Sequence, residues 1–132
     1  MLKIETPVQE VKASQEAVYA FMADMNNLEK LMPEQVINWK SDSDTCSYTI
    51  KGMADIRMKM ESRKPSDQLV MQSEGGPFPF KLTLNILPSG SHASAAMVFE
   101  GEVNPFLKMM VEKPLKNFFS LLVSNLAREF AS

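Results

Sequence analysis

The residues of this chain that could take part in covalent chemistry are few and lie far apart. Cys46 is the one cysteine and His92 is the one histidine. A reactive thiol needs a positive neighbour or a helix N-terminus to lower its pKa, and the strand-like sequence around Cys46 offers neither. His92 directly follows a turn and has no partner histidine or cysteine at zinc-site spacing. We therefore expect no metal, no cofactor and no catalytic residue at these positions.

Other catalytic signatures are also missing from the sequence. The pair Gly75-Gly76 is followed by neither Lys-Ser/Thr nor a helical pattern, so we interpret it as a turn rather than a phosphate loop. Glu100 and Glu102 alternate with Phe99, which predicts that they point away from the apolar face. No pair of inward carboxylates is therefore predicted to perform acid–base chemistry. The sequence favours a protein that is not an enzyme, without deciding the question.

The size and charge of the chain restrict the kinds of molecule that this protein is expected to bind. We expect one domain, residues 1–132, because no linker or repeat divides the sequence. The formal net charge is −2, from 14 basic and 16 acidic residues, which argues against a nucleic-acid partner. The sequence contains no run of 18 apolar residues, so we expect no stable insertion into a membrane. The lone cysteine and the absence of a signal-peptide pattern predict a cytoplasmic location.

The pattern of apolar residues predicts the elements that would position any site. Alternation over residues 2–11 predicts an edge strand interrupted by Pro7. Ser14 then precedes an apolar stripe of helical period, and a second short helical face ends at Pro33. From residue 35 the period becomes two, and short turns between the segments favour antiparallel neighbours. The six strands predicted here are residues 36–41, 45–51, 54–63, 68–74, 78–87 and 92–103.

The last segment, 105–131, returns to a helical period. Asn104-Pro105 has the composition of a helix start. Pro114 lies inside the pattern, and we expect it to kink or split the segment into a short helix and a long one. One long helix is a narrow cover for a wide sheet. The space between them is either filled by large side chains or left as a cavity, and this choice decides the function.

Methionine is unusually frequent, with 11 in 132 residues. Thioethers are flexible and polarizable, so they suit a pocket that adapts to apolar ligands, although they also serve as ordinary core filling. Met109 and Met110 are predicted to line this pocket together with the strand methionines. Tyr48 would supply one hydrogen bond to a ligand, or would place its hydroxyl at the solvent-exposed rim. The predicted ligand-binding residues are Tyr48, Met58, Met60, Met71, Phe80, Leu82, Leu84, Met97, Phe99, Phe118 and Leu122.

Two segments of the chain carry a family resemblance. Residues 11–34, with A-V-x-x-F-M-x-D at 17–24 and L-x-x-L-x-P at 28–33, together with the C-terminal helix, resemble the START-like superfamily, also called SRPBCC. This superfamily includes polyketide cyclases and the G-type subunit of carbon-monoxide dehydrogenase. The resemblance implies an α+β helix-grip fold of order β-α-α-β6-α, with about seven curved antiparallel strands around a long C-terminal helix. It also implies a deep cavity that holds a lipophilic molecule.

Three functional hypotheses follow from these patterns. The first is a non-catalytic carrier or sensor that binds a small hydrophobic molecule between the sheet and the C-terminal helix. The second is a cyclase or dehydratase that uses the same pocket, which would need an inward acid, base or strong donor. The third is a protein-interaction module, which would need an exposed apolar patch. The sequence leaves open the ligand, the pathway and the oligomeric state.

Overall fold

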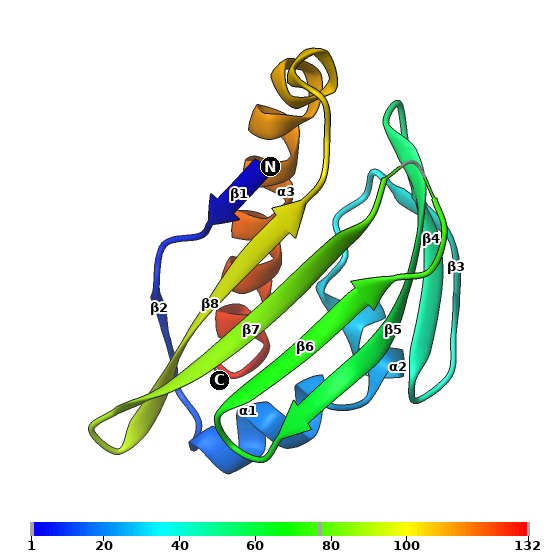
Figure 1. Cartoon of the computed structure of the whole chain (residues 1–132). Coiled ribbons are helices and arrows are strands. Elements are labelled where there is room, and N and C mark those ends of the chain that lie inside the picture. The colour runs from blue at the N-terminus through cyan, green and yellow to red at the C-terminus, as the bar shows by residue number, and fades with distance from the viewer. Residues whose placement is uncertain (1, 77, 132) are drawn as a thin grey trace.

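The computed structural model describes residues 2–76 and 78–131 of the chain. Within these residues, eight antiparallel strands form one curved sheet, and one long helix lies behind it (Figure 1). The predicted α+β helix-grip architecture is confirmed. The elements are β1 (Leu2–Glu5), β2 (Gln9–Val11), α1 (Gln15–Met22), α2 (Met25–Leu28), the 3₁₀ turn η1 (Glu29–Leu31), β3 (Val36–Ser41), β4 (Thr45–Ile50), β5 (Ala54–Lys64), β6 (Gln68–Ser73), β7 (Phe80–Ser89), β8 (His92–Gly101) and α3 (Pro105–Glu129).

The N-terminal segment corrects one prediction, because residues 2–11 form two strands rather than one. The sheet follows the order β1-β8-β7-β6-β5-β4-β3, and β2 also pairs with β8. Between β1 and β2, the Thr6 N–H donates to the Met97 carbonyl at 3.0 Å, and the Thr6 Oγ1 accepts from the Met97 N–H at 2.9 Å. Pro7 has no N–H to continue the ladder. Pairing with β8 resumes at Gln9.

Replacing Thr6 tests this junction. Thr6→Val keeps the shape of the side chain but removes the oxygen that accepts the Met97 N–H, in a place where Thr6 is buried. A buried donor left without an acceptor costs about 1–3 kcal/mol, so we expect a loss of unfolding free energy of that size. Thr6→Ser keeps the acceptor and serves as the control. Denaturant unfolding of both variants measures the difference, and equal stabilities would contradict the assignment.

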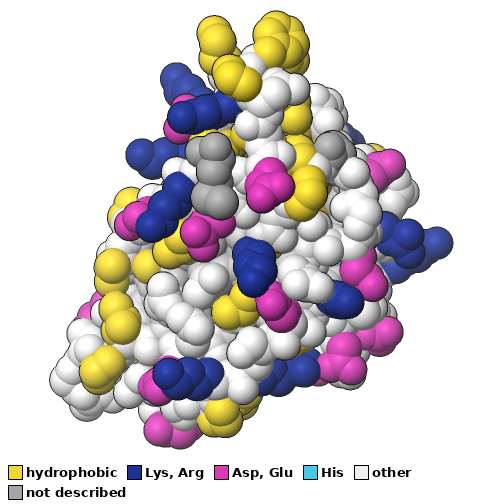
Figure 2. Space-filling view, in the orientation of Figure 1, with side chains coloured by type: hydrophobic (Ala, Val, Ile, Leu, Met, Phe, Trp, Pro, Cys, Tyr) yellow, Lys and Arg dark blue, Asp and Glu magenta, His cyan; other side chains and the backbone are white. Residues whose placement is uncertain are grey.

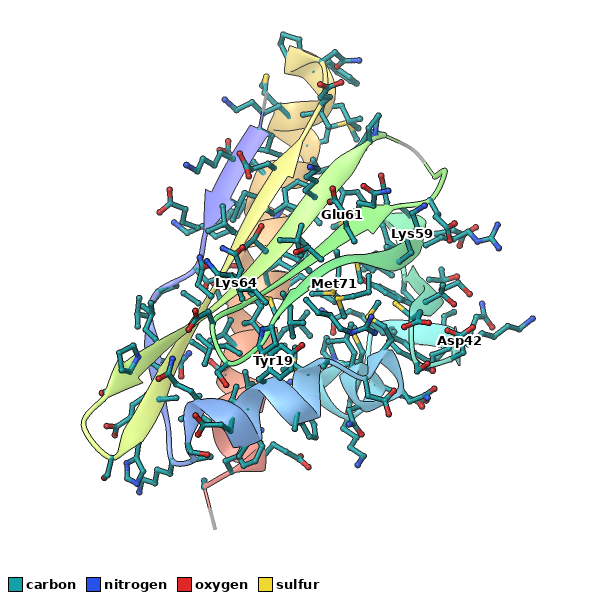
Figure 3. All side chains as sticks on the ribbon, turned by 60° about the horizontal axis from the view of Figure 1, so that its bottom comes forward. Tyr19, Asp42, Lys59, Glu61, Lys64 and Met71 are labelled. Atoms are coloured by element: carbon teal, nitrogen blue, oxygen red, sulfur yellow. The ribbon has the colours of Figure 1, made fainter. Side chains whose placement is uncertain are left out.

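Two short helices close one end of the space between the sheet and α3. Ser14 caps α1 by accepting from the Ala17 N–H at 3.1 Å, and Asp24 caps α2 by accepting from the Asn26 N–H at 3.0 Å. α1 packs against β6, β7 and β8, and α2 packs against β4. Figure 3 views this end, with Tyr19 of α1 below Met71, which lies on β6 of the sheet. We call it the closed end.

The opposite end is formed by loops and by the start of α3. The turn 51–53, residues 74–76 and 78–79, and residues 102–105 gather there, at the top of Figure 1. Several of its apolar side chains are only partly buried, although they pack against the core. We call it the open end. Its partly buried apolar residues are Met53, Phe78, Val103 and Leu107.

The long helix corrects a second prediction, because Pro114 neither splits it nor ends it. α3 runs without interruption from Pro105 to Glu129. Proline removes the hydrogen bond to the carbonyl four residues earlier, which is that of Met110. Both Pro114 and Met110 are exposed, so water can solvate this carbonyl. The proline is tolerated because it lies on the outer side of the helix.

The position of α3 over the sheet is asymmetric. Its backbone approaches β1, β2, β8 and η1. Across the wider space to β4, the Phe118 ring meets the Tyr48 ring with centroids 6.4 Å apart. Long side chains therefore fill the space between α3 and the β4 side of the sheet. The buried residues of the helix are Val111, Leu115, Phe118, Phe119, Leu122, Val123 and Leu126.

Candidate functional site

The eleven residues predicted to bind a ligand come together in the structure. Ten of them are buried members of one hydrophobic cluster, and Met60 is partly buried against it. They come from the inner faces of β4 to β8 and from α3. Their contact with a ligand remains a prediction.

The strand register explains why side chains distant in sequence become neighbours here. Met60 of β5 pairs with Met71 of β6, which pairs with Leu82 of β7, which pairs with Phe99 of β8. Residues paired in this way lie side by side on one face of a sheet, with Cβ atoms roughly 5 Å apart. A second row joins Leu84 to Met97. The flexible thioethers thus lie along the middle of the inner face.

Seven aromatic rings form a continuous row between the sheet and α3, which we call the aromatic row. Successive ring centroids are 5.2–6.4 Å apart, within the range of stacked and edge-to-face contacts. The row crosses from β3 to the loop before β7 and passes through two adjacent residues of α3. In order, its members are Trp39, Tyr48, Phe118, Phe119, Phe99, Phe80 and Phe78.

Three members of the aromatic row were not among the predicted ligand-binding residues. Trp39 stacks on Tyr48, with centroids 5.3 Å apart, and its Nε1 donates to the Ser41 hydroxyl at 2.9 Å. Phe78 and Phe119 both contact Phe99. Phe78 and Phe119 follow the inward periodicity of their strand and helix, whereas Trp39 packs against the core because the register of β3 shifts between Ile37 and Lys40. Their ring-to-ring contacts depend on how the sheet curves toward α3, which single-strand periodicity does not give.

The interior has little polarity. Burial raises the pKa of the Tyr48 phenol, and no hydrogen bond from another described residue contributes to the shift. Burial likewise raises the pKa of the Cys46 thiol to about 12. Both groups are therefore neutral at physiological pH. Among the described residues, Thr6 is the buried residue with a hydrophilic side chain, and its hydroxyl is already hydrogen-bonded to β8.

The charged residues of β5 include two with different surroundings. Glu61 lies outside and pairs with Lys81 at 3.3 Å. Arg63 instead donates to the Ala23 and Ser43 carbonyls and to Asp44 Oδ1 at 2.7 Å. It ties the end of α1 to the turn before β4. Sequence alternation places Arg63 outside the core correctly but does not reveal these partners.

Met109 and Met110 correct a third prediction. We expected them to line the pocket, but both side chains are exposed. They lie on the first turns of α3, on the side opposite the buried Val111 and Leu115. The side of these turns that packs against the core carries Val111 and Leu115. Met109 and Met110 therefore face solvent.

Three hollows on the described surface lie outside the space between the sheet and α3. One of about 510 Å³ is on the outer face at the open end, lined by Gln72, Lys81, Glu100 and Glu102 among others. Another, of about 290 Å³, lies over the outer face of β3 to β5. A third, of about 280 Å³, lies between η1 and the end of α3. In residues 2–76 and 78–131, no three His, Cys, Asp or Glu side chains form a group that could hold a metal ion.

Comparison with solved structures shows the same fold at low sequence identity. XoxI from Bacillus cereus superimposes with a TM-score of 0.80 at 15% identity, covering 100% of this chain and 97% of that one. TTHA0849 from Thermus thermophilus gives 0.75 at 14% identity, covering 98% and 97%. The Aha1 dimer from Colwellia psychrerythraea gives 0.72 at 14% identity, covering 98% and 96%.

Comparison of the sequence with models of protein families shows the family of this chain. No curated protein matches the sequence significantly. The model for "Polyketide cyclase / dehydrase and lipid transport" matches residues 1–131. Its match covers the helical segment at 11–34, the strands and the long C-terminal helix, which are the features that carry the family resemblance. The chain therefore belongs to the polyketide cyclase / dehydrase and lipid transport family, which has the SRPBCC-type ligand-binding fold.

Proposed function

We propose that this protein is a non-catalytic carrier or sensor that binds a small lipophilic molecule between α3 and the β4–β6 part of the sheet. The observation that supports this most is the composition of that interior. It combines flexible thioethers with neutral rings, and its one phenol, Tyr48, has its pKa shifted by burial without help from a hydrogen bond. Such a lining favours apolar ligands that have one polar end.

The position of α3 supports the same location. The helix packs by its backbone against the β1, β2 and β8 side, whereas Phe118 and Tyr48 bridge the wider space toward β4. Met58 and Met71 line the inner face there and can change rotamer without moving the backbone. A ligand would occupy this space by displacing these side chains, and it would enter at the open end.

Extraction of the freshly purified protein with organic solvent, followed by mass spectrometry, tests the proposal directly. We expect a co-purified lipophile, and we expect an emptied sample to take up a fluorescent fatty-acid probe. Tyr48→Phe should weaken a probe with a polar end about fivefold, the effect of one lost hydrogen bond, and should leave a purely apolar probe unaffected. An empty extract together with no probe uptake would reject the proposal. A cytoplasmic location remains part of this hypothesis.

A further inference from the structure

The start of α3 presents apolar side chains to solvent where the fold does not require them. Phe106, Met109 and Met110 are 73%, 83% and 59% exposed. They lie at spacings of three and four residues, so they share one side of the helix. Figure 2 shows hydrophobic side chains gathered at this end of the molecule, over the start of α3 in Figure 1. We call these three residues the apolar tip.

Basic residues lie directly behind the apolar tip. Residues 104–117 contain three lysines and one glutamate, a net charge of +2, in a chain whose net charge is −2. Lys113 follows Phe106 by seven residues and therefore continues the same side of the helix, about 5 Å below Met109 and Met110. Lys108 and Lys116 are also exposed. In the described part of the chain, none of these lysines belongs to an ion pair.

From this arrangement, we propose that the apolar tip docks the protein on an anionic lipid surface. The tip would insert below the headgroups, while Lys108, Lys113 and Lys116 would lie at headgroup level. This is the distribution that peripheral helices use at membrane interfaces. Docking of this kind is superficial. No helix among the described residues is long and apolar enough to cross a bilayer.

Size and shape favour a lipid surface over a protein partner. With about 200 Å² for each such side chain, the three residues expose roughly 400 Å². A stable protein interface buries about 800 Å² on each partner, so the tip alone is too small for a stable dimer. The tip is also a projecting helix end rather than a groove (Figure 1). A fluid interface can surround such a projection without needing a complementary shape.

The neighbourhood of the tip is consistent with a docked orientation. Leu107 and Val111, on the inner side of the same turns, lead from the tip toward the core. The partly buried residues of the open end lie beside them. A docked protein would hold the open end against the bilayer. Docking itself depends on the tip and its lysines, and it does not require that the interior bind a lipid.

Vesicle flotation of the whole chain tests the proposal. The vesicles contain phosphatidylcholine alone or phosphatidylcholine with phosphatidylglycerol, at low and at high ionic strength. We expect binding to the anionic vesicles that weakens as salt increases. The double variant Phe106→Ser, Met109→Ser should lower this binding more than tenfold, because most of the apolar area that inserts into the bilayer is lost. Lys113→Glu should lower it about fivefold on anionic vesicles and leave neutral vesicles unaffected.

Two variants at the closed end serve as matched controls. Leu87→Ser removes an apolar side chain that is 43% exposed on β7, and Lys64→Glu reverses a charge on β5. Neither should change vesicle binding. The replaced residues are exposed in every variant, so thermal unfolding should confirm that all of them fold.

Three results would overturn the proposal. One is a wild-type protein that floats with neither kind of vesicle. Another is binding that survives the double serine change. The third is a dimer in light scattering that dissociates on Phe106→Ser while vesicles are ignored, which would assign the tip to a second copy of the chain. The double serine variant should still take up the fluorescent fatty-acid probe from solution, because the replaced residues lie outside the interior. Loss of vesicle binding with probe uptake retained therefore tests docking separately from the proposed function.

Discussion

Raising the pH from 9.0 to 12 is expected to lower the unfolding free energy by about 3 kcal/mol through Cys46 alone. Burial in an apolar strand pair raises the pKa of this thiol from its ordinary 9.0 to about 12. Below pH 9.0 the thiol is protonated in both states, so its contribution is fully present. Between pH 9.0 and 12 only the unfolded chain releases the proton, and the folded state becomes progressively less favourable.

Tyr48 acts in the same direction from a higher pH. Its ordinary pKa is 10.0, and burial raises it, so the unfolded phenol ionises first and favours unfolding. Denaturant midpoints measured across the alkaline range show how steeply the stability falls as the pH rises. The double variant Cys46→Ala, Tyr48→Phe removes both groups and keeps the lysines, which titrate in the same range. The alkaline loss should be clearly smaller in this variant, and an identical loss would show that neither group is responsible.

Truncating Phe118 is expected to cost about 3–5 kcal/mol of stability and to increase the uptake of a fluorescent fatty-acid probe. The ring is 2% exposed and lies between Tyr48 and Phe119. Phe118→Ala removes the side chain that bridges α3 to the β4 side of the sheet. The space that it leaves lies where the proposed ligand would bind.

The next residue provides the control. Phe119 is 5% exposed, but it stacks on Phe99, with centroids 5.2 Å apart, on the side where α3 packs against β8. Phe119→Ala should therefore cost a similar amount of stability without a comparable gain in probe uptake. Equal uptake by the two variants would contradict the proposed position of the ligand. Unfolding curves and probe titrations on both variants measure the two effects.

Periodicity alone was enough to predict most of the fold. The alternation of Phe80, Leu82 and Leu84 identifies β7, and all three are buried as expected. Ser14 and Asn104 cap the helices that their positions predict. These features depend on neighbours close in sequence, where side-chain type and spacing act directly on the backbone.

The errors arose where distant parts of the chain decide the outcome. The N-terminal segment forms two strands because Pro7 has no N–H to continue the ladder, and the Thr6 side chain replaces a backbone partner for Met97 of β8, a contact that local alternation cannot identify. Pro114 is tolerated because its side of α3 has no neighbour, which again depends on the position of the helix relative to the sheet. The aromatic row required the curvature of the sheet. The set of inward residues was predictable, and the order of their contacts was not.

The pairing of β1 with β8 also determines when the fold can be completed during synthesis. Leu2 pairs with Gly101, so during synthesis β1 has no partner until about a hundred further residues have followed it. The hairpins from β3 to β7 can form earlier, because each joins neighbours in sequence. A nascent chain stalled before β8 would therefore expose Leu2 and Ile4 to chaperones, and synthesis of β8 and α3 would allow both side chains to become buried.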